Sequence, residues 1–224
     1  MPRVAHDKVI ECYSDSSTLI TSRPQAQAFE ALLQIWDSHR EWSDNHLLAL
    51  IIATVASETA NFRVRNEILS FPSAERIQSL WPTHFSTVAA AKPFVNNPQA
   101  LAEEVYKGRF GNTDPGDGWR YRGRGMAMLL GREEYARYRQ IVGLDLIANP
   151  DLVLIPAVGA RVAFEAYFPA STISAISEIF LKNPDNWQGA IGAVHRVFDK
   201  DGIETKSKVL YDCINNAVIS KQSG

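Results

Sequence analysis

Two glutamates, Glu58 and Glu67, combine a residue type and a spacing that suit acid–base chemistry. Glu58 continues the apolar stripe of a predicted helix, because at 100° per residue Leu47 and Ile51 lie within about 20° of it. A carboxyl on a face that should be buried costs free energy unless it is paired or lies at the mouth of a cleft with a raised pKa. A raised pKa is what a general acid needs near neutrality. The alternative is that the helix frays after Val55 and leaves Glu58 exposed.

Glu67 follows nine residues after Glu58, with a predicted turn between them. This separation can place two carboxyls on opposite walls of one groove. Such a pair is the machinery of glycoside hydrolysis, in which the distance between the carboxyls separates inverting from retaining enzymes. The sequence does not give that distance.

The segment 108–125 (GRFGNTDPGDGWRYRGRG) differs from the rest of the chain, since its 18 residues include six glycines and four arginines. Glycines allow close approach of the backbone to a ligand. Trp119 and Tyr121 could stack on sugars or bases, and the arginines could bind carboxylate or phosphate. A solvated loop between two helices is an equally good reading. Nucleic-acid binding is disfavoured, because no basic face accompanies the segment.

Helical periodicity dominates the chain, and strand-like alternation is scarce. Asp44 is a predicted N-cap for a helix from residue 45 to about 60. The other predicted helices are Pro24–Trp36, Ala74–Leu80, Pro98–Tyr106, Glu133–Val142, Ala157–Tyr167, Trp187–Phe198 and Lys206–Val218. We therefore expect a mainly α architecture.

Three stretches of the chain carry a resemblance: TVASETANFRVRNEILSF, LWPTHF and VYKGRFGNTDPGDGWRYRGRGMAMLLGREEY. These stretches resemble the glycoside hydrolase family 19 domain, with phage endolysins and bacterial chitinase-like proteins as the nearest members. The resemblance runs from about Trp36 to Phe198. The resemblance implies a lysozyme-like, two-lobed helical domain with a substrate groove. It also implies inverting hydrolysis of β-1,4 bonds in chitin or peptidoglycan, with Glu58 as the acid and Glu67 as the base. The implied substrate-binding positions are Trp119, Tyr121, Arg124, Met128 and Asp199.

The departures from the family pattern fall where chemistry is expected. Ser57 replaces the usual His before the acid, and Met128 and Leu130 replace a sugar-binding Gln and a water-binding hydroxyl residue. Neither Met nor Leu is a strong donor or acceptor. Glu134 stands where Asn is common, and Asp199 brings a charge where the family has an amide.

Two explanations follow from these departures. In the first, the chain is a divergent hydrolase in which Thr59, Tyr121 or Asn61 hold water and substrate. In the second, the scaffold has lost catalysis and binds a glycan or a protein partner. A protein-binding role predicts an exposed apolar patch over 126–130, where a sugar groove would be polar. Retention of both glutamates favours the hydrolase, with peptidoglycan preferred over chitin.

Composition limits the remaining possibilities. The chain has 224 residues, 46% hydrophobic and 21% charged, with a net charge of −2, which excludes disorder and bulk-charge binding of nucleic acid or anionic lipid. Residues 1–22 are expected to form an N-terminal extension, and 23–224 a single catalytic domain. Without a legible signal peptide, synthesis in the cytoplasm is expected, with reduced Cys12 and Cys213.

Action on the cell wall or periplasm would then need delivery. A delivery system and an inhibitor protein are therefore candidate partners beside the glycan. We expect a monomer without membrane insertion, metal or cofactor.

Overall fold

The chain is mainly helical, which confirms the expected fold class. The computed structural model describes residues 4–17, 20–39, 43–63, 65–194 and 200–217. It divides the chain into two compact units, the first made of residues 1–64 and 155–224 and the second of residues 65–154. No helix among the described residues has the length and apolar character that crossing a membrane requires.

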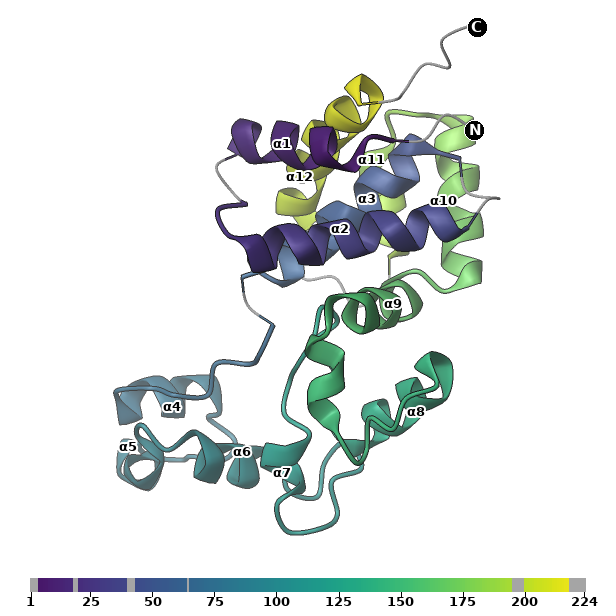
Figure 1. The fold of residues 1–224 in the computed structure, drawn as a ribbon. Coiled ribbons are helices and arrows are strands. Elements are labelled where there is room, and N and C mark those ends of the chain that lie inside the picture. Colours follow the sequence, from purple (N-terminus) through teal and green to yellow (C-terminus); the bar gives the residue numbers. More distant parts are fainter. Residues whose placement is uncertain (1–3, 18–19, 40–42, 64, 195–199, 218–224) are drawn as a thin grey trace, which may run out of the picture. The chain divides into compact units, whose positions relative to one another are not determined.

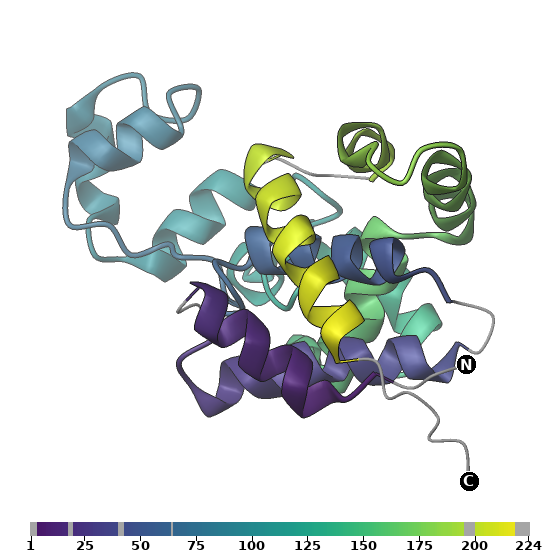
Figure 2. The same ribbon diagram turned by 90° about the horizontal axis from the view of Figure 1, so that it is seen from above.

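The first unit is built around helix α3, which carries Glu58 at its end (Figure 1). Every α3 residue from 47 to 56 is buried, so this helix is covered on all sides. Helix α12 packs on it and crosses over it in the view of Figure 2, and α2 and α10 also contact it. The helices of this unit are α1 (His6–Ser17), α2 (Arg23–Ser38), α3 (Asn45–Glu58), α9 (Pro156–Tyr167), α10 (Ala170–Lys182), α11 (Trp187–Ala193) and α12 (Lys200–Asn216).

A disulfide joins Cys12 of α1 to Cys213 of α12, so the expectation of reduced thiols was wrong. The two cysteines are 201 residues apart in sequence, and their Cα atoms lie 5.6 Å apart. The bond forms because α1 packs on α12, a contact that the sequence pattern did not predict. Helix α1, which belongs to the expected extension of residues 1–22, thus lies within the first unit.

The second unit carries Glu67 and the glycine-rich segment. Its elements are α4 (Ala74–Leu80), α5 (Val88–Ala91), the 3₁₀ helix η1 (Lys92–Phe94), α6 (Pro98–Tyr106), α7 (Asp117–Arg120), α8 (Arg132–Val142) and the 3₁₀ helix η2 (Pro150–Leu154). Side chains of α4 and α6 form a core with Leu69 and Phe85, against which Trp119 and Leu130 also pack. Isolated antiparallel bridges join Arg124, near the end of the glycine-rich segment, to Asn66 and to Leu129.

Most predicted helices are present, with boundaries set by their caps. Helices α4 and α6 match their predicted bounds, and Ser73 and Asn97 cap them as N-cap side chains should. Asp44 caps α3 by accepting from the His46 backbone N–H at 2.9 Å. Helices α1, α5, α7 and α10 were not predicted. Helix α11 ends at Ala193, earlier than expected, and α12 begins at Lys200, earlier than the expected Lys206.

Candidate active site

Glu58 is the last residue of α3 and is half-buried. The helix therefore continues three residues past Val55, and the alternative in which it frays there was wrong. A carboxyl at this position is neither fully solvated nor enclosed in the core.

The chain turns sharply after Glu58 through three left-handed residues, Ala60, Asn61 and Phe62, with φ of 47°, 58° and 63°. Such conformations are costly for residues other than glycine, so surrounding contacts must hold them. The Thr59 hydroxyl donates to the Val55 carbonyl at 2.5 Å and accepts from the Phe62 N–H at 2.9 Å. The ring of Phe62 stacks on Phe29 at 5.6 Å.

Side chains of α1 and α2 hold the same turn. The Gln25 amide donates to the Asn61 carbonyl at 2.7 Å, and the Tyr13 hydroxyl donates to the Asn61 side chain at 3.5 Å. The hydroxyl of Thr59 is thus fully buried and used by the turn. It is not placed to hold an attacking water, one of the roles considered for it.

Ser57, which replaces the family's His, is bonded from the C-terminal helix. Its hydroxyl accepts a hydrogen bond from Lys206 Nζ of α12 at 3.0 Å. The same ammonium donates to the Gly202 carbonyl at 3.4 Å. The Lys206 ammonium of α12 therefore bonds the residue that precedes Glu58 in α3.

Glu67 is held by two hydrogen-bond donors, one to each carboxylate oxygen. The Tyr106 hydroxyl of α6 donates to Oε1, and the Gly123 backbone N–H donates to Oε2 at 3.1 Å. The Glu67 N–H in turn donates to the Gly123 carbonyl at 2.8 Å. The carboxylate is half-buried and fixed in orientation by groups from two other segments of the unit.

This arrangement leaves acceptor capacity on Glu67. An ionised carboxylate offers about four lone-pair sites, of which the two donors use two. Burial, followed by the charge of Glu67 and the hydrogen bond to it, raises the pKa of Tyr106 well above its usual range. Tyr106 therefore keeps its proton and remains a donor, and Glu67 has acceptor sites left for further hydrogen bonds.

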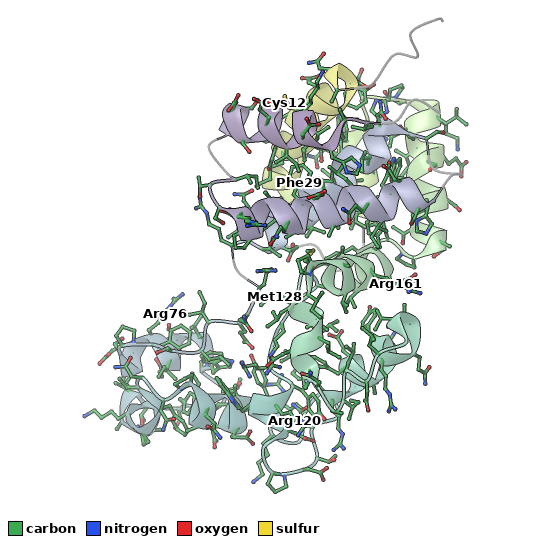
Figure 3. The ribbon with its side chains drawn as sticks, viewed as in Figure 1. Cys12, Phe29, Arg76, Arg120, Met128 and Arg161 are labelled. Carbon is green, nitrogen blue, oxygen red and sulfur yellow. A yellow bond between two sulfur atoms is a disulfide. The ribbon has the colours of Figure 1, made fainter. Side chains whose placement is uncertain are left out.

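Met128 lies beside Glu67. A methyl group built on Gly123 would sit 3.1 Å from the Cβ of Glu67 and 3.4 Å from the Cε of Met128. Met128 (Figure 3) is half-buried and has a left-handed φ of 47°. The thioether side chain of Met128, which has no strong donor or acceptor, therefore packs near the same glycine that donates to Glu67.

The segment around Met128 is part of the interior of the second unit. Met126, Ala127 and Leu129 are buried, and Leu130 packs on the core while its N–H donates to Glu134 at 3.0 Å. The exposed apolar patch predicted for a protein-binding module over 126–130 is therefore not present in this segment. Glu134 serves the turn that leads into α8.

Three other predicted substrate-binding residues lie around a hollow in the second unit. Trp119 of α7 is half-buried, and the Arg122 guanidinium covers its ring at 3.8 Å. Tyr121 is buried, with its hydroxyl on the Ile147 carbonyl at 3.2 Å, so its ring has no open face for a sugar. Arg124 is buried and ion-paired with Asp151 at 2.8 Å. The hydrogen bond of Tyr121 and the ion pair of Arg124 therefore give these two side chains structural roles in the second unit.

The structure brings together Glu67 and Met128, with Trp119, Tyr121 and Arg124 in the same unit, while Glu58 lies in the first unit. Asp199 lies outside the described residues.

Sequence reasoning missed Tyr106 as the donor to Glu67, since the two are 39 residues apart. Its place in the VYKGRFG stretch was the available signal. Within the described ranges, no group of three or more His, Cys, Asp or Glu side chains could hold a metal ion.

Comparison with known proteins supports the resemblance seen in the motifs. Over 100 residues the chain is 32% identical to a Haemophilus influenzae protein named "Glycosyl hydrolase family 19 domain-containing protein". The match covers 44% of this chain and 50% of that protein, so it spans only half of the relative's length. No protein-family model matches the chain.

Solved structures similar to the chain include two bacterial chitinases. Chitinase C from Streptomyces griseus HUT6037 is 16% identical, with a TM-score of 0.46, over 92% of this chain and 76% of its own. A bacterial family 19 chitinase is 17% identical, with a TM-score of 0.46, over 92% of this chain and 94% of its own.

Proposed function

We propose that this chain is a glycan hydrolase that cleaves β-1,4 bonds of amino-sugar polymers with inversion, using Glu58 as the acid and Glu67 as the base. The observation that carries the proposal is the carboxylate of Glu67, held on one oxygen by Tyr106 and on the other by the Gly123 N–H. A base that must deprotonate a water in a fixed direction needs this kind of restraint. The match to a family 19 domain protein supports the same reaction class.

In the proposed reaction, Glu58 gives its proton to the glycosidic oxygen while the bond from that oxygen to the anomeric carbon breaks. Water attacks the anomeric carbon from the opposite face, and Glu67 takes the proton that the water loses. The position of Glu58 at the half-buried end of α3 suits a proton donor.

We assign peptidoglycan as the preferred substrate and chitin as the alternative. The preference rests on the resemblance to the endolysin branch of the family. On this assignment the protein acts on the cell wall or periplasm. The disulfide between Cys12 and Cys213 supports action there, because oxidising compartments are where such bonds persist.

A second candidate function is a glycan-binding module without catalysis. It is favoured by Met128, whose thioether lies beside Glu67 where a sugar-binding amide is expected. Loss of a substrate-positioning or water-positioning hydrogen bond is often worth about 10²-fold in rate. The two candidates differ in one respect: only the hydrolase releases products.

The test is release of soluble fragments from purified peptidoglycan and from chitin oligomers, measured by chromatography and mass spectrometry. We expect wild type to release products and Glu58→Gln and Glu67→Gln to lower the rate at least about 10³-fold, because each removes one proton-transfer group. Glu104→Gln, which changes an exposed carboxyl on α6, is the matched control and should retain full activity.

Circular dichroism and thermal unfolding would confirm that each variant is folded. Products released equally by wild type and both variants would contradict the roles of Glu58 and Glu67. Absence of products from well-folded wild type on both polymers would contradict the hydrolase and leave the binding module.

A further inference from the structure

The second unit contains a hollow of about 860 Å³ that the proposed reaction does not use. Its walls come from the segment 114–124, from α8 and from the segment 145–151. Five arginines and four aspartates line it: Arg120, Arg122, Arg124, Arg132, Arg139, Asp114, Asp117, Asp145 and Asp151. All of these residues belong to one compact unit.

Three of the five arginines have aspartate partners. Arg124 pairs with Asp151 at 2.8 Å, and Arg139 with Asp145 at 3.3 Å. Arg132 contacts both Asp114 at 2.5 Å and Asp117 at 3.2 Å. These pairs use all four aspartates of the hollow, so its remaining charge is positive.

The other two arginines, Arg120 and Arg122, make no ion pair with any carboxylate in the part of the chain that the structure describes. Arg120 donates to the carbonyls of Ile147 at 3.1 Å and Ala148 at 2.8 Å. Arg122 donates to the Trp119 carbonyl at 3.0 Å, and its guanidinium carbon lies over the indole, 3.8 Å from the ring centroid. Neutral groups, namely backbone carbonyls and the Trp119 ring, thus hold the guanidinium groups of Arg120 and Arg122 in place.

Arg122 is a partly desolvated cation. Burial, and then the neighbouring charge of Arg124, lower the pKa of Arg122. A cation in this condition is stabilised by an incoming anion, because the anion supplies the opposite charge that burial withholds. A planar guanidinium that is already oriented binds a carboxylate with little further loss of conformational entropy.

We propose that this hollow binds the carboxylate of a short peptide attached to the glycan, with Arg120 and Arg122 as the anion-binding side chains. That the peptide is carried by a glycan rests on the proposed function, whereas the anion chemistry does not. The volume exceeds what a single small anion fills, and the paired aspartates can accept amide N–H groups along a peptide. The same aspartates disfavour a dianion such as phosphate.

The probe is N-acetylmuramoyl dipeptide, a single sugar with no glycosidic bond to cut, so hydrolysis plays no part in the result. Binding to the full chain is followed by calorimetry and by amide NMR shifts. We expect saturable binding with shifts in residues 114–124 and 145–151. Arg120→Gln and Arg122→Gln should each raise Kd about 10-fold or more, because each removes a charge-assisted contact. Arg76→Gln, an exposed arginine on α4 (Figure 3), should leave Kd unchanged.

Four further arms test the ligand group and the role of the arginines. The probe with its carboxyl amidated should bind about 10-fold or more weakly, and tri-N-acetylchitotriose should not compete for the hollow. Arg120→Lys and Arg122→Lys keep the charge and should lose less affinity than the Gln variants, which separates charge from folding effects. Equal binding of the amidated probe, or shifts outside the hollow, would overturn the proposal. Competition by inorganic phosphate at the same concentration would overturn the peptide assignment.

Discussion

At the scale of single residues, the account depends on how one carboxylate is held. Glu67 has a tyrosine donor on one oxygen and a backbone N–H on the other. A backbone donor cannot be removed by a change of side chain at Gly123, where a methyl group would press on Glu67 itself. Tyr106 is therefore the partner that mutation can test, and its ring is buried in the core of the second unit.

Tyr106→Phe should lower kcat about 10- to 100-fold while KM changes little. The ring stays in the core, but Glu67 loses a hydrogen bond to a charged acceptor, worth about 1.5–3 kcal/mol. Steady-state kinetics on soluble glycan fragments measure the effect. Tyr121→Phe is the matched control, because it removes a buried hydroxyl that donates to the Ile147 carbonyl and not to Glu67. A fall in kcat as large for Tyr121→Phe as for Tyr106→Phe would contradict the specific role of Tyr106.

Sequence reasoning identified Glu58 and Glu67 but not the groups around them. Periodicity singled out Glu58, since a carboxyl on an apolar stripe is visible in a single helix. Glu67 was chosen for its spacing of nine residues from Glu58 and for the resemblance to the family. The Tyr106 contact depends on how α6 packs near the segment after residue 64, which no local pattern encodes. For the same reason Tyr121 and Arg124, chosen for their chemistry, are buried and bonded within the unit.

At the scale of elements, helices with strong caps were predictable and weakly patterned ones were not. Helices α4 and α6 begin at Ser73 and Asn97 caps and match their predicted bounds. Helix α1 has a polar, serine-rich sequence and gains its place by packing on α12. The left-handed turn after Glu58 was equally invisible, because Gln25, Tyr13 and Phe29 hold it from distant parts of the chain.

The disulfide between α1 and α12 should contribute about 2–5 kcal/mol to the free energy of unfolding, since it closes a loop of 201 residues in the unfolded chain. The double variant Cys12→Ser/Cys213→Ser should therefore unfold at lower temperature and lower urea concentration than the oxidised wild type. Wild type in excess reductant should behave like the double variant. Two titratable thiols in the non-reduced, unfolded wild type would contradict the bond.

At the scale of the whole molecule, each compact unit contributes one of the two proposed catalytic groups. The first unit presents Glu58 at the end of its central helix, and the second fixes Glu67 between α6 and the glycine-rich segment. The second unit also contains the arginine-lined hollow, so the proposed peptide site and the proposed base share one scaffold. The central claim is that the two carboxyls act together in inverting hydrolysis.

The most direct test of that claim is the anomeric configuration of the first products, followed by proton NMR immediately after wild type is added to a soluble β-1,4 amino-sugar oligomer or peptidoglycan fragment. Inversion at a β bond predicts that new reducing ends appear as the α anomer and only later equilibrate with the β anomer. Initial appearance of the β anomer would contradict the acid–base pair and indicate a covalent, retaining mechanism. No new reducing ends from folded protein would contradict hydrolysis itself.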